Sequence, residues 1–159
     1  MKVIYHCYGG THTSIVAAHI HLKKLNSNQV PSVSEMYELA YFDNLSYKDF
    51  GKLHFIGFDE KFNEIYSCGF KHSAYIAKNA IKDILKIYNL NYKDLYFVST
   101  LKLINLNIRL GGFLSRKLGL VRLGRPLAIK GVRSDYFKIS AFVEKVKDDL
   151  ERDHQKEKV

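Results

Sequence analysis

The segment at residues 5–14, Tyr-His-Cys-Tyr-Gly-Gly-Thr-His-Thr-Ser, most constrains how this chain folds. It follows an apolar opening typical of a strand and leads into an amphipathic stretch typical of a helix. Glycines allow close backbone approach, and the first amides of a helix have no partner inside the helix, so this order of residues favours an anion site. The pattern predicts a phosphate-type binding loop over residues 8–15.

The remaining pattern predicts a three-layer α/β domain with a mostly parallel sheet, an antiparallel hairpin and a P-loop-like strand–loop–helix unit at the N-terminus. We expect strands at residues 2–8, 53–58, 64–70, 95–99 and 127–132, and helices at residues 13–25, 35–40, 73–88, 101–118 and 136–150. The hairpin has a five-residue turn at residues 59–63. The long segment at residues 26–50 is of a length that often covers a site. A single domain over residues 1–150 and a frayed, charged tail over residues 151–159 complete the expected organisation.

Composition indicates the setting in which the protein works. No apolar run approaches the ~20 residues of a membrane span, and the first residues lack the pattern of a signal peptide. We therefore expect a cytoplasmic protein with no membrane partner. Cys7 and Cys68 are too few for a disulfide framework, so free thiols are expected.

The net charge of +9 is concentrated in one part of the chain. Residues 101–147 hold 11 Lys or Arg against 2 Asp or Glu, whereas residues 1–100 hold 11 against 9. Five of the six arginines fall within 25 positions: Arg109, Arg116, Arg122, Arg125 and Arg133. This segment is either a ligand-binding surface, a solvated basic face or a nucleic-acid contact.

Three separated blocks of this sequence resemble one bacterial family. The blocks are residues 5–14, the hairpin residues His54-Phe55, Asp59-Glu60 and Asn63-Glu64, and residues 111–126 with Gly-Gly-Phe-Leu-Ser-Arg, Leu-Gly-Leu and Gly-Arg-Pro. The chain resembles domain of unknown function 3189, an uncharacterised family associated with spore-forming Firmicutes. The resemblance implies no activity and no catalytic residue. Phe62 stands where the family is expected to have a glycine, which leaves the turn type open.

The loop can be compared with two known kinds of phosphate site. In a Walker A alignment, His12 takes the position of the lysine, and Thr13 or Ser14 would bind Mg²⁺. A Cys-x5-Arg phosphatase loop is not supported, because Thr13 occupies the sixth position after Cys7 and no other arginine is near in sequence. The candidate ligand-binding residues of the loop are Gly9, Gly10, Thr11, His12, Thr13 and Ser14. The alternatives are another anion, such as a carboxylate, and a tight turn whose glycines serve packing alone.

The candidate catalytic residues are Cys7, His6 and His12. Cys7 ends a strand beside a helix N-terminus, where a thiol can become a nucleophile, although a free cysteine is also a common buried residue. His6 or His12 would act as a general acid or base, and we expect His12 to be accessible to solvent. A zinc site built from Cys7, His12, Cys68 and His72 matches no strong spacing template, so no metal ligands are assigned.

Arginines supply the cation that the loop lacks. Arg109 and Arg116 are seven residues apart and would lie on one face of a helix, from which they would clamp a phosphate. Arg125 lies in a predicted loop before a strand and is a third candidate. The sequence thus predicts binding of a phosphorylated small molecule or nucleotide, with hydrolase or transferase activity as an open question. The alternatives are a non-catalytic binding or regulatory protein and nucleic-acid binding through residues 101–147.

Overall fold

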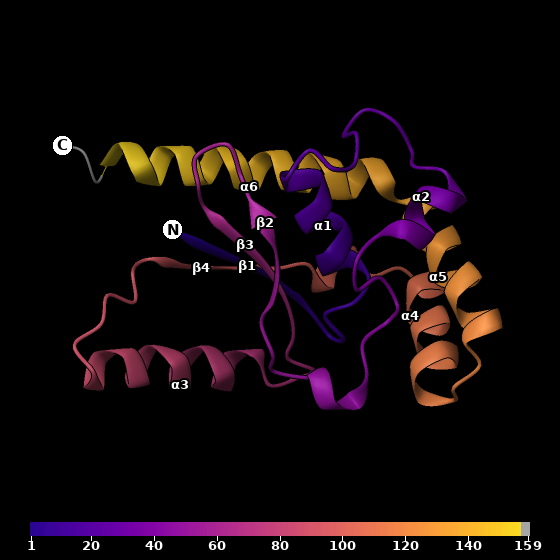
Figure 1. Cartoon of the computed structure of the whole chain (residues 1–159), viewed down its shortest axis with the longest axis horizontal. Coiled ribbons are helices and arrows are strands. Elements are labelled where there is room, and N and C mark those ends of the chain that lie inside the picture. The colour runs from indigo at the N-terminus through magenta and orange to yellow at the C-terminus, as the bar shows by residue number, and fades with distance from the viewer. Residues whose placement is uncertain (157–159) are drawn as a thin grey trace.

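The central sheet has the strand order β2–β3–β1–β4 in a computed structural model that describes residues 1–156 (Figure 1). The strands are β1 (Lys2–Cys7), β2 (His54–Phe58), β3 (Glu64–Gly69) and β4 (Leu95–Ser99). β1 pairs in parallel with both β3 and β4, and β2 pairs antiparallel with β3. A mixed α/β fold with one antiparallel pair is therefore confirmed. Because the neighbours of β1 lie on opposite sides of it, the crevice at its carboxyl end is the place where such sheets bind ligands.

Helices cover the two faces of the sheet (Figure 1). α1 (Thr13–His21) and α6 (Tyr136–Lys156) lie on one face, and α3 (Ala74–Ile87) lies on the other. Side chains alternate along β1, so Val3 and Tyr5 join the larger core while Ile4 joins a smaller cluster with residues of α3. Because of this alternation, Cys7 faces the loop and His6 faces the opposite side of the sheet.

The structure corrects the predicted strand at residues 127–132, which belongs to helix α5 (Val121–Ser134). Ala128, Ile129 and Val132 are buried at helical spacing against neighbouring helices, although the same apolar run also fits a strand. α5 packs closely on α4 (Leu106–Gly112), and a Cβ at Gly111 would meet the backbone of Ala128. Tertiary packing therefore selects the helix.

Other boundaries differ from the predictions in informative ways. The helix predicted at residues 101–118 is divided into the short helix η2 (Leu101–Leu103), α4 and a π-helical turn, η3 (Phe113–Lys117). Gly119 ends this region in the left-handed conformation, with φ +71°. The tail predicted to fray is helical as far as Lys156, and residues 157–159 lie outside the described residues. Two further short helices, α2 (Val33–Glu38) and η1 (Tyr47–Asp49), occupy the long segment before β2.

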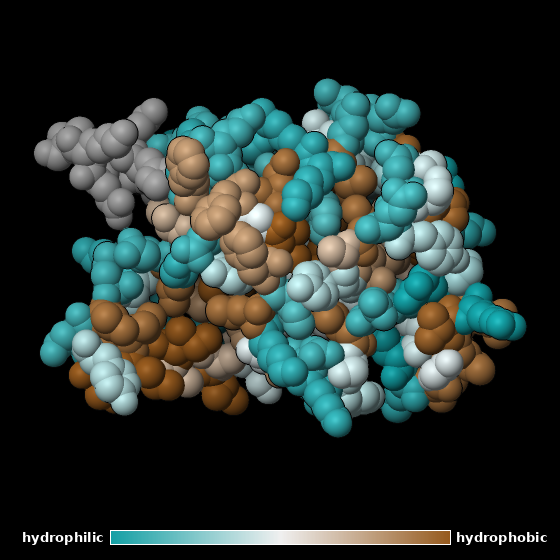
Figure 2. Space-filling model, in the orientation of Figure 1, coloured by the Kyte–Doolittle hydropathy of each residue, from teal (hydrophilic) through white to brown (hydrophobic). Residues whose placement is uncertain are grey.

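α3 leaves apolar side chains on the surface. Ile76 and Ile87 of this helix are exposed. Figure 2 shows a hydrophobic area over α3 at the lower left. Within residues 1–156, no helix has both the length and the apolar character needed to cross a membrane.

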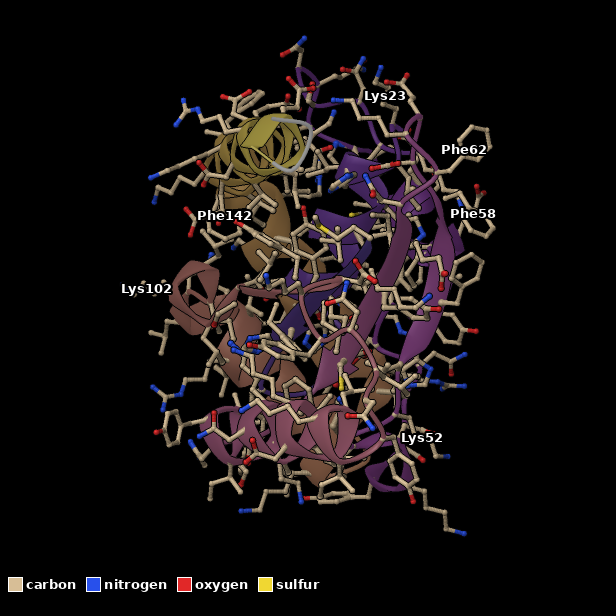
Figure 3. The ribbon with its side chains drawn as sticks, turned by 90° about the vertical axis from the view of Figure 1, so that its left-hand side faces the viewer. Lys23, Lys52, Phe58, Phe62, Lys102 and Phe142 are labelled. Carbon is tan, nitrogen blue, oxygen red and sulfur yellow. The ribbon has the colours of Figure 1, made fainter. Side chains whose placement is uncertain are left out.

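The hairpin turn at residues 59–63 explains why a glycine would be favoured there. The amide of Phe62 donates to the carbonyl of Asp59 at 3.0 Å, and Phe62 adopts φ +59°. Asp59 also accepts hydrogen bonds from the amides of Lys61 and Asn63, so its carboxylate organises the turn. Phe58 and Phe62 point outward from the hairpin (Figure 3). A bulky residue therefore occupies a left-handed position without burying its side chain.

Phe62→Gly is expected to raise the free energy of unfolding by about 1 kcal/mol, because the left-handed conformation strains a residue that has a Cβ. The Phe62 side chain is 85% exposed, so little packing is lost. Urea denaturation measures the change. Phe58→Gly is the control, because Phe58 is also exposed but has no positive φ, and this variant should lose stability. Equal losses in both variants would contradict the prediction.

Candidate functional site

The turn after β1 depends on two glycines for close packing. Gly10 has φ +69°, and a Cβ there would overlap the backbone of Gly69 at the end of β3. A Cβ at Gly9 would collide with a guanidinium nitrogen of Arg116. The loop therefore needs a glycine at position 10 to pass beside β3, whereas a side chain at position 9 would displace the guanidinium group of Arg116.

Several amides of the loop have no hydrogen-bond acceptor in the described part of the chain. The amide of Gly10 donates to Sγ of Cys7 at 3.1 Å. The structure gives the amides of residues 11–14 no hydrogen-bond acceptor within residues 1–156. They belong to the segment that begins α1, where unpaired N–H groups and the helix dipole favour an anion.

The hydroxyl groups of the loop form hydrogen bonds with other parts of the protein. Thr11 donates to the carbonyl of Tyr41 at 2.7 Å, and the hydroxyl of Thr13 lies 3.0 Å from that of Thr100. The Ser14 hydroxyl lies 3.3 Å from Sγ of Cys7 and accepts a hydrogen bond from Ser67 at 2.9 Å. These hydroxyls hold the loop in place, and the side chains of Thr13 and Ser14 are fully buried.

The described residues contain no cluster of three or more His, Cys, Asp or Glu side chains that would hold a metal ion. The four residues considered for zinc, namely Cys7, His12, Cys68 and His72, are therefore not brought together as a metal site.

Cys7 lies at the carboxyl end of the central strand, with its sulfur directed toward the loop. Gly10 and Ser14 both contact the sulfur. The residue is only 3% exposed, but it forms part of the wall of a cavity described below. Cys68, in contrast, is fully buried, and burial raises the pKa of its thiol to about 12.

An arginine lies beside the Cys7 loop, although no arginine is close to Cys7 in the sequence. Nη1 of Arg116 donates to the carbonyl of Gly9 at 2.7 Å, and Nη2 donates to the carbonyl of Ser46 at 3.1 Å. The guanidinium carbon also lies 5.2 Å from the centre of the Phe50 ring. Burial lowers the pKa of Arg116, while the nearby Cys7 and acidic groups act in the opposite direction. Arg116 is therefore fixed beside the loop.

The π-helical turn η3 positions two consecutive side chains around the loop. Ser115 donates to Oδ1 of Asp43 at 2.7 Å, and Arg116 binds the loop carbonyl of Gly9. Single π turns inside helices often occur at functional sites, because the extra residue redirects neighbouring side chains.

His12 is buried and paired, which corrects the expectation that it is accessible to solvent. The residue is 7% exposed, and its Nε2 lies 3.0 Å from Oδ1 of Asp43. Aromatic contact with Phe42 fixes the other side of the ring, with centroids 5.4 Å apart. Because Nε2 faces Asp43, Nδ1 is the ring nitrogen left for the cavity, to which His12 also contributes.

Asp43 joins the long segment before β2 to three other parts of the chain. Oδ1 faces His12 and Ser115, and Oδ2 lies 3.5 Å from Nε of Arg125. Burial alone would raise the pKa of Asp43, but hydrogen bonds from His12 and Ser115, with the positive charge of Arg125, hold that pKa below its ordinary value. Asp43 is therefore a buried carboxylate that supports the site.

A cavity of about 660 Å³ opens beside the loop, and we call it the loop cavity. Its walls come from the loop, η1, the segments that follow β3 and β4, α4 and the π-helical turn. Its basic residues are His12, Lys71, His72, Arg109, Arg116 and Lys117. No Asp or Glu is among the described residues that line it. The apolar residues of the lining include Phe50, Leu101, Ile104, Ile108 and Phe113.

The predicted arginines occupy three different environments. Arg109 and Arg116 both line the loop cavity, and Arg109 has no hydrogen-bond or ion-pair partner for its side chain within the described residues. Arg125 instead donates to the carbonyl of Asp43 at 3.0 Å and does not line the cavity. Arg122 is exposed in α5. Only part of the basic segment is therefore available to a ligand in the cavity.

His6 lies apart from the loop cavity, which argues against its predicted catalytic role. It points to the opposite face of β1 from Cys7 and packs against Phe70, with ring centroids 5.3 Å apart. Neither ring nitrogen has a hydrogen-bond partner in the part of the chain that the structure describes. Burial, with a smaller effect of Lys78, lowers the pKa of His6 to about 4.

Sequence reasoning missed several residues of the site. Asp43, Tyr47 and Phe50 come from the long segment before β2, where no local pattern marks them. Lys71 follows β3, and its position could have been found, because the carboxyl ends of neighbouring parallel strands meet at one edge. The sequence indicated His72 only as a possible zinc ligand and not as part of an anion site.

Comparison with known protein families shows to which family this chain belongs. The model of the family described as "Protein of unknown function (DUF3189)" matches residues 2–148. The chain therefore belongs to this family, as the three sequence blocks indicated. No curated protein and no solved structure matches the chain.

Proposed function

We propose that the loop cavity binds the phosphate group of a phosphorylated small molecule or nucleotide. The observation that carries this proposal is the charge of the lining: four Lys or Arg side chains and no carboxylate among the described residues surround the cavity. Thr11 and His12, whose amides have no acceptor among the described residues, line the same cavity just before α1 begins. Cations without acidic partners are stabilised by an anionic ligand.

The apolar walls favour an organic group next to the phosphate. Leu101, Ile104 and Phe113 line the part of the cavity supplied by the segment after β4 and by the helices that follow. The volume of about 660 Å³ lies within the range of roughly 300–1,000 Å³ found for small-molecule sites. A phosphate attached to an aromatic or other apolar group fits this combination better than a free inorganic anion.

Nucleic-acid binding through residues 101–147 is the alternative. The basic residues of this segment are divided, since Arg125 pairs with Asp43 and Arg133 donates to the carbonyl of Pro31 at 2.9 Å. This division favours a local cavity over one extended surface. Binding of single-stranded RNA that weakens steeply with salt, with no response to small phosphates, would instead support the nucleic-acid alternative.

Arg109→Gln is expected to weaken binding of AMP and inorganic phosphate about 5–20-fold, because it removes one charge-assisted contact from the cavity. The two dissociation constants are measured by calorimetry at constant ionic strength. Arg122→Gln is the matched control, because it removes the same charge from an exposed position outside the cavity lining. We expect this control to change affinity less than about twofold.

Two results would contradict the proposed function. One is the absence of any phosphate or phosphomonoester binding by the wild-type protein. The other is an equal loss in Arg109→Gln and Arg122→Gln, which would indicate a general effect of net charge.

A further inference from the structure

We propose that Cys7 is the nucleophile of a phosphomonoester hydrolase. Arg116, in the π-helical turn, supplies the cation that a Cys-x5-Arg phosphatase loop carries within the loop itself. This inference rests on the proposed function, because it requires the phosphate to bind in the loop cavity. It adds a reaction and a catalytic residue to that site.

The surroundings of the Cys7 sulfur are those of a reactive thiol. The amide of Gly10 donates to the sulfur, and the Ser14 hydroxyl lies within hydrogen-bond distance of it. The unpaired amides of residues 11–14 continue from this point into the N-terminus of α1. Amide donors, a hydroxyl and a nearby cation stabilise a thiolate and then the oxygens of a phosphate that it attacks.

Arg116 supplies the arginine that is missing from the sixth position after Cys7. Thr13, at the sixth position after Cys7, turns its hydroxyl away toward Thr100. Arg116 comes from 109 residues farther along the chain and lies against the Gly9 carbonyl, while it also lines the cavity. Two carbonyl contacts and the Phe50 ring fix the guanidinium group. A cation fixed in this way can stabilise the charge of a phosphoryl group in transfer.

The reaction has two balanced steps. In the first, the Cys7 thiolate attacks phosphorus, an S–P bond forms, and the bond from phosphorus to the ester oxygen breaks while that oxygen takes a proton from Nδ1 of His12. In the second, water attacks phosphorus, the S–P bond breaks, and His12 regains a proton from the water. The products are an alcohol, inorganic phosphate and the regenerated thiolate. Asp43 holds Nε2 of His12 and so positions the proton donor.

The test uses 4-nitrophenyl phosphate, whose aromatic group matches the apolar walls of the cavity. We expect wild-type protein to release nitrophenol and Cys7→Ser to lower kcat about 1,000-fold or more, because the hydroxyl is a far weaker nucleophile. Cys7→Ser should keep its affinity for inorganic phosphate. Cys68→Ser is the matched control, and its rate should stay within about twofold of wild type, because Cys68 lies outside the cavity lining.

A measurement on the wild-type protein makes the test independent of how the variant folds. Rapid-quench mass spectrometry should find a phosphoryl group on the peptide that contains Cys7 during turnover. Iodoacetamide should modify Cys7 before Cys68 and stop turnover, and orthovanadate should protect Cys7 from this reagent.

The outcomes separate the two proposals. Wild-type protein that binds neither phosphate nor 4-nitrophenyl phosphate overturns the proposed function. Binding without turnover and without phosphorylated Cys7 overturns only the proposed reaction. Turnover that persists in Cys7→Ser also overturns it.

Discussion

Replacing Asp43 with alanine is expected to lower the free energy of unfolding by about 3–5 kcal/mol at pH 7, which is the usual cost of removing one member of a buried ionic network. The Asp43 side chain is fully buried and faces His12, Ser115 and Arg125. Without the carboxylate, these groups lose their shared partner. The π-helical turn then loses a contact that holds it beside the loop, so affinity for phosphate should also fall.

Urea denaturation of Asp43→Ala and wild-type protein measures this effect. Asp148→Ala is the control, since it removes the same charge from an exposed position and should change stability by less than about 0.5 kcal/mol. Because the pKa of Asp43 is lowered by folding, its stabilising effect is present above the ordinary aspartate value of about 4 and is lost as the pH falls through the lower folded value. Similar losses for both variants at pH 7 would show that the network contributes little.

Local sequence patterns predicted most of the sheet and the helices beside it. β4 was predicted at its observed bounds, and the hairpin was predicted with its five-residue turn at residues 59–63. These elements have continuous apolar runs or clear turn residues, so their conformation depends on near neighbours. The helix at residues 13–25 was predicted too long, since α1 ends at His21.

The error at residues 127–132 has a different physical origin. A short apolar run fits either a buried strand or one face of a helix, and only its partners decide between them. Here the partner is α4, and small residues such as Gly111 and Gly124 allow the two helices to approach closely. Such complementarity between distant residues has no signature in a local window.

The sequence predicted a loop between the first strand and the first helix, but not the internal hydrogen bonds of its side chains. Gly9 and Gly10 lie where expected, whereas the hydroxyls of Thr11 and Thr13 bind other parts of the protein. The position of Arg116 beside the Cys7 loop depends on the packing of α4 and η3 against the rest of the fold. Binding by the loop and by Arg109, Arg116 and Arg125 stays a prediction until a ligand is tested.

His6→Leu is expected to stabilise the protein, and to do so more at acidic pH. Leucine has a similar size to histidine and removes two ring nitrogens that have no hydrogen-bond partner among the described residues. At pH 8, relief of this unpaired polarity should raise the free energy of unfolding by about 1 kcal/mol. The face of β1 that holds His6 also contains Ile4, so an aliphatic side chain fits its neighbours.

The pH dependence of this gain follows from the lowered pKa of His6. Burial lowers that pKa to about 4, so the folded protein keeps His6 neutral while the unfolded chain binds a proton below about pH 6.5. Stability is therefore lost as the pH falls from about 6.5 to about 4, and the leucine variant does not share this loss. The difference in unfolding free energy between His6→Leu and wild type should be about 2–3 kcal/mol larger at pH 4.5 than at pH 8. Urea denaturation at both values measures it, and an equal difference at the two pH values would show that His6 titrates normally in the folded protein.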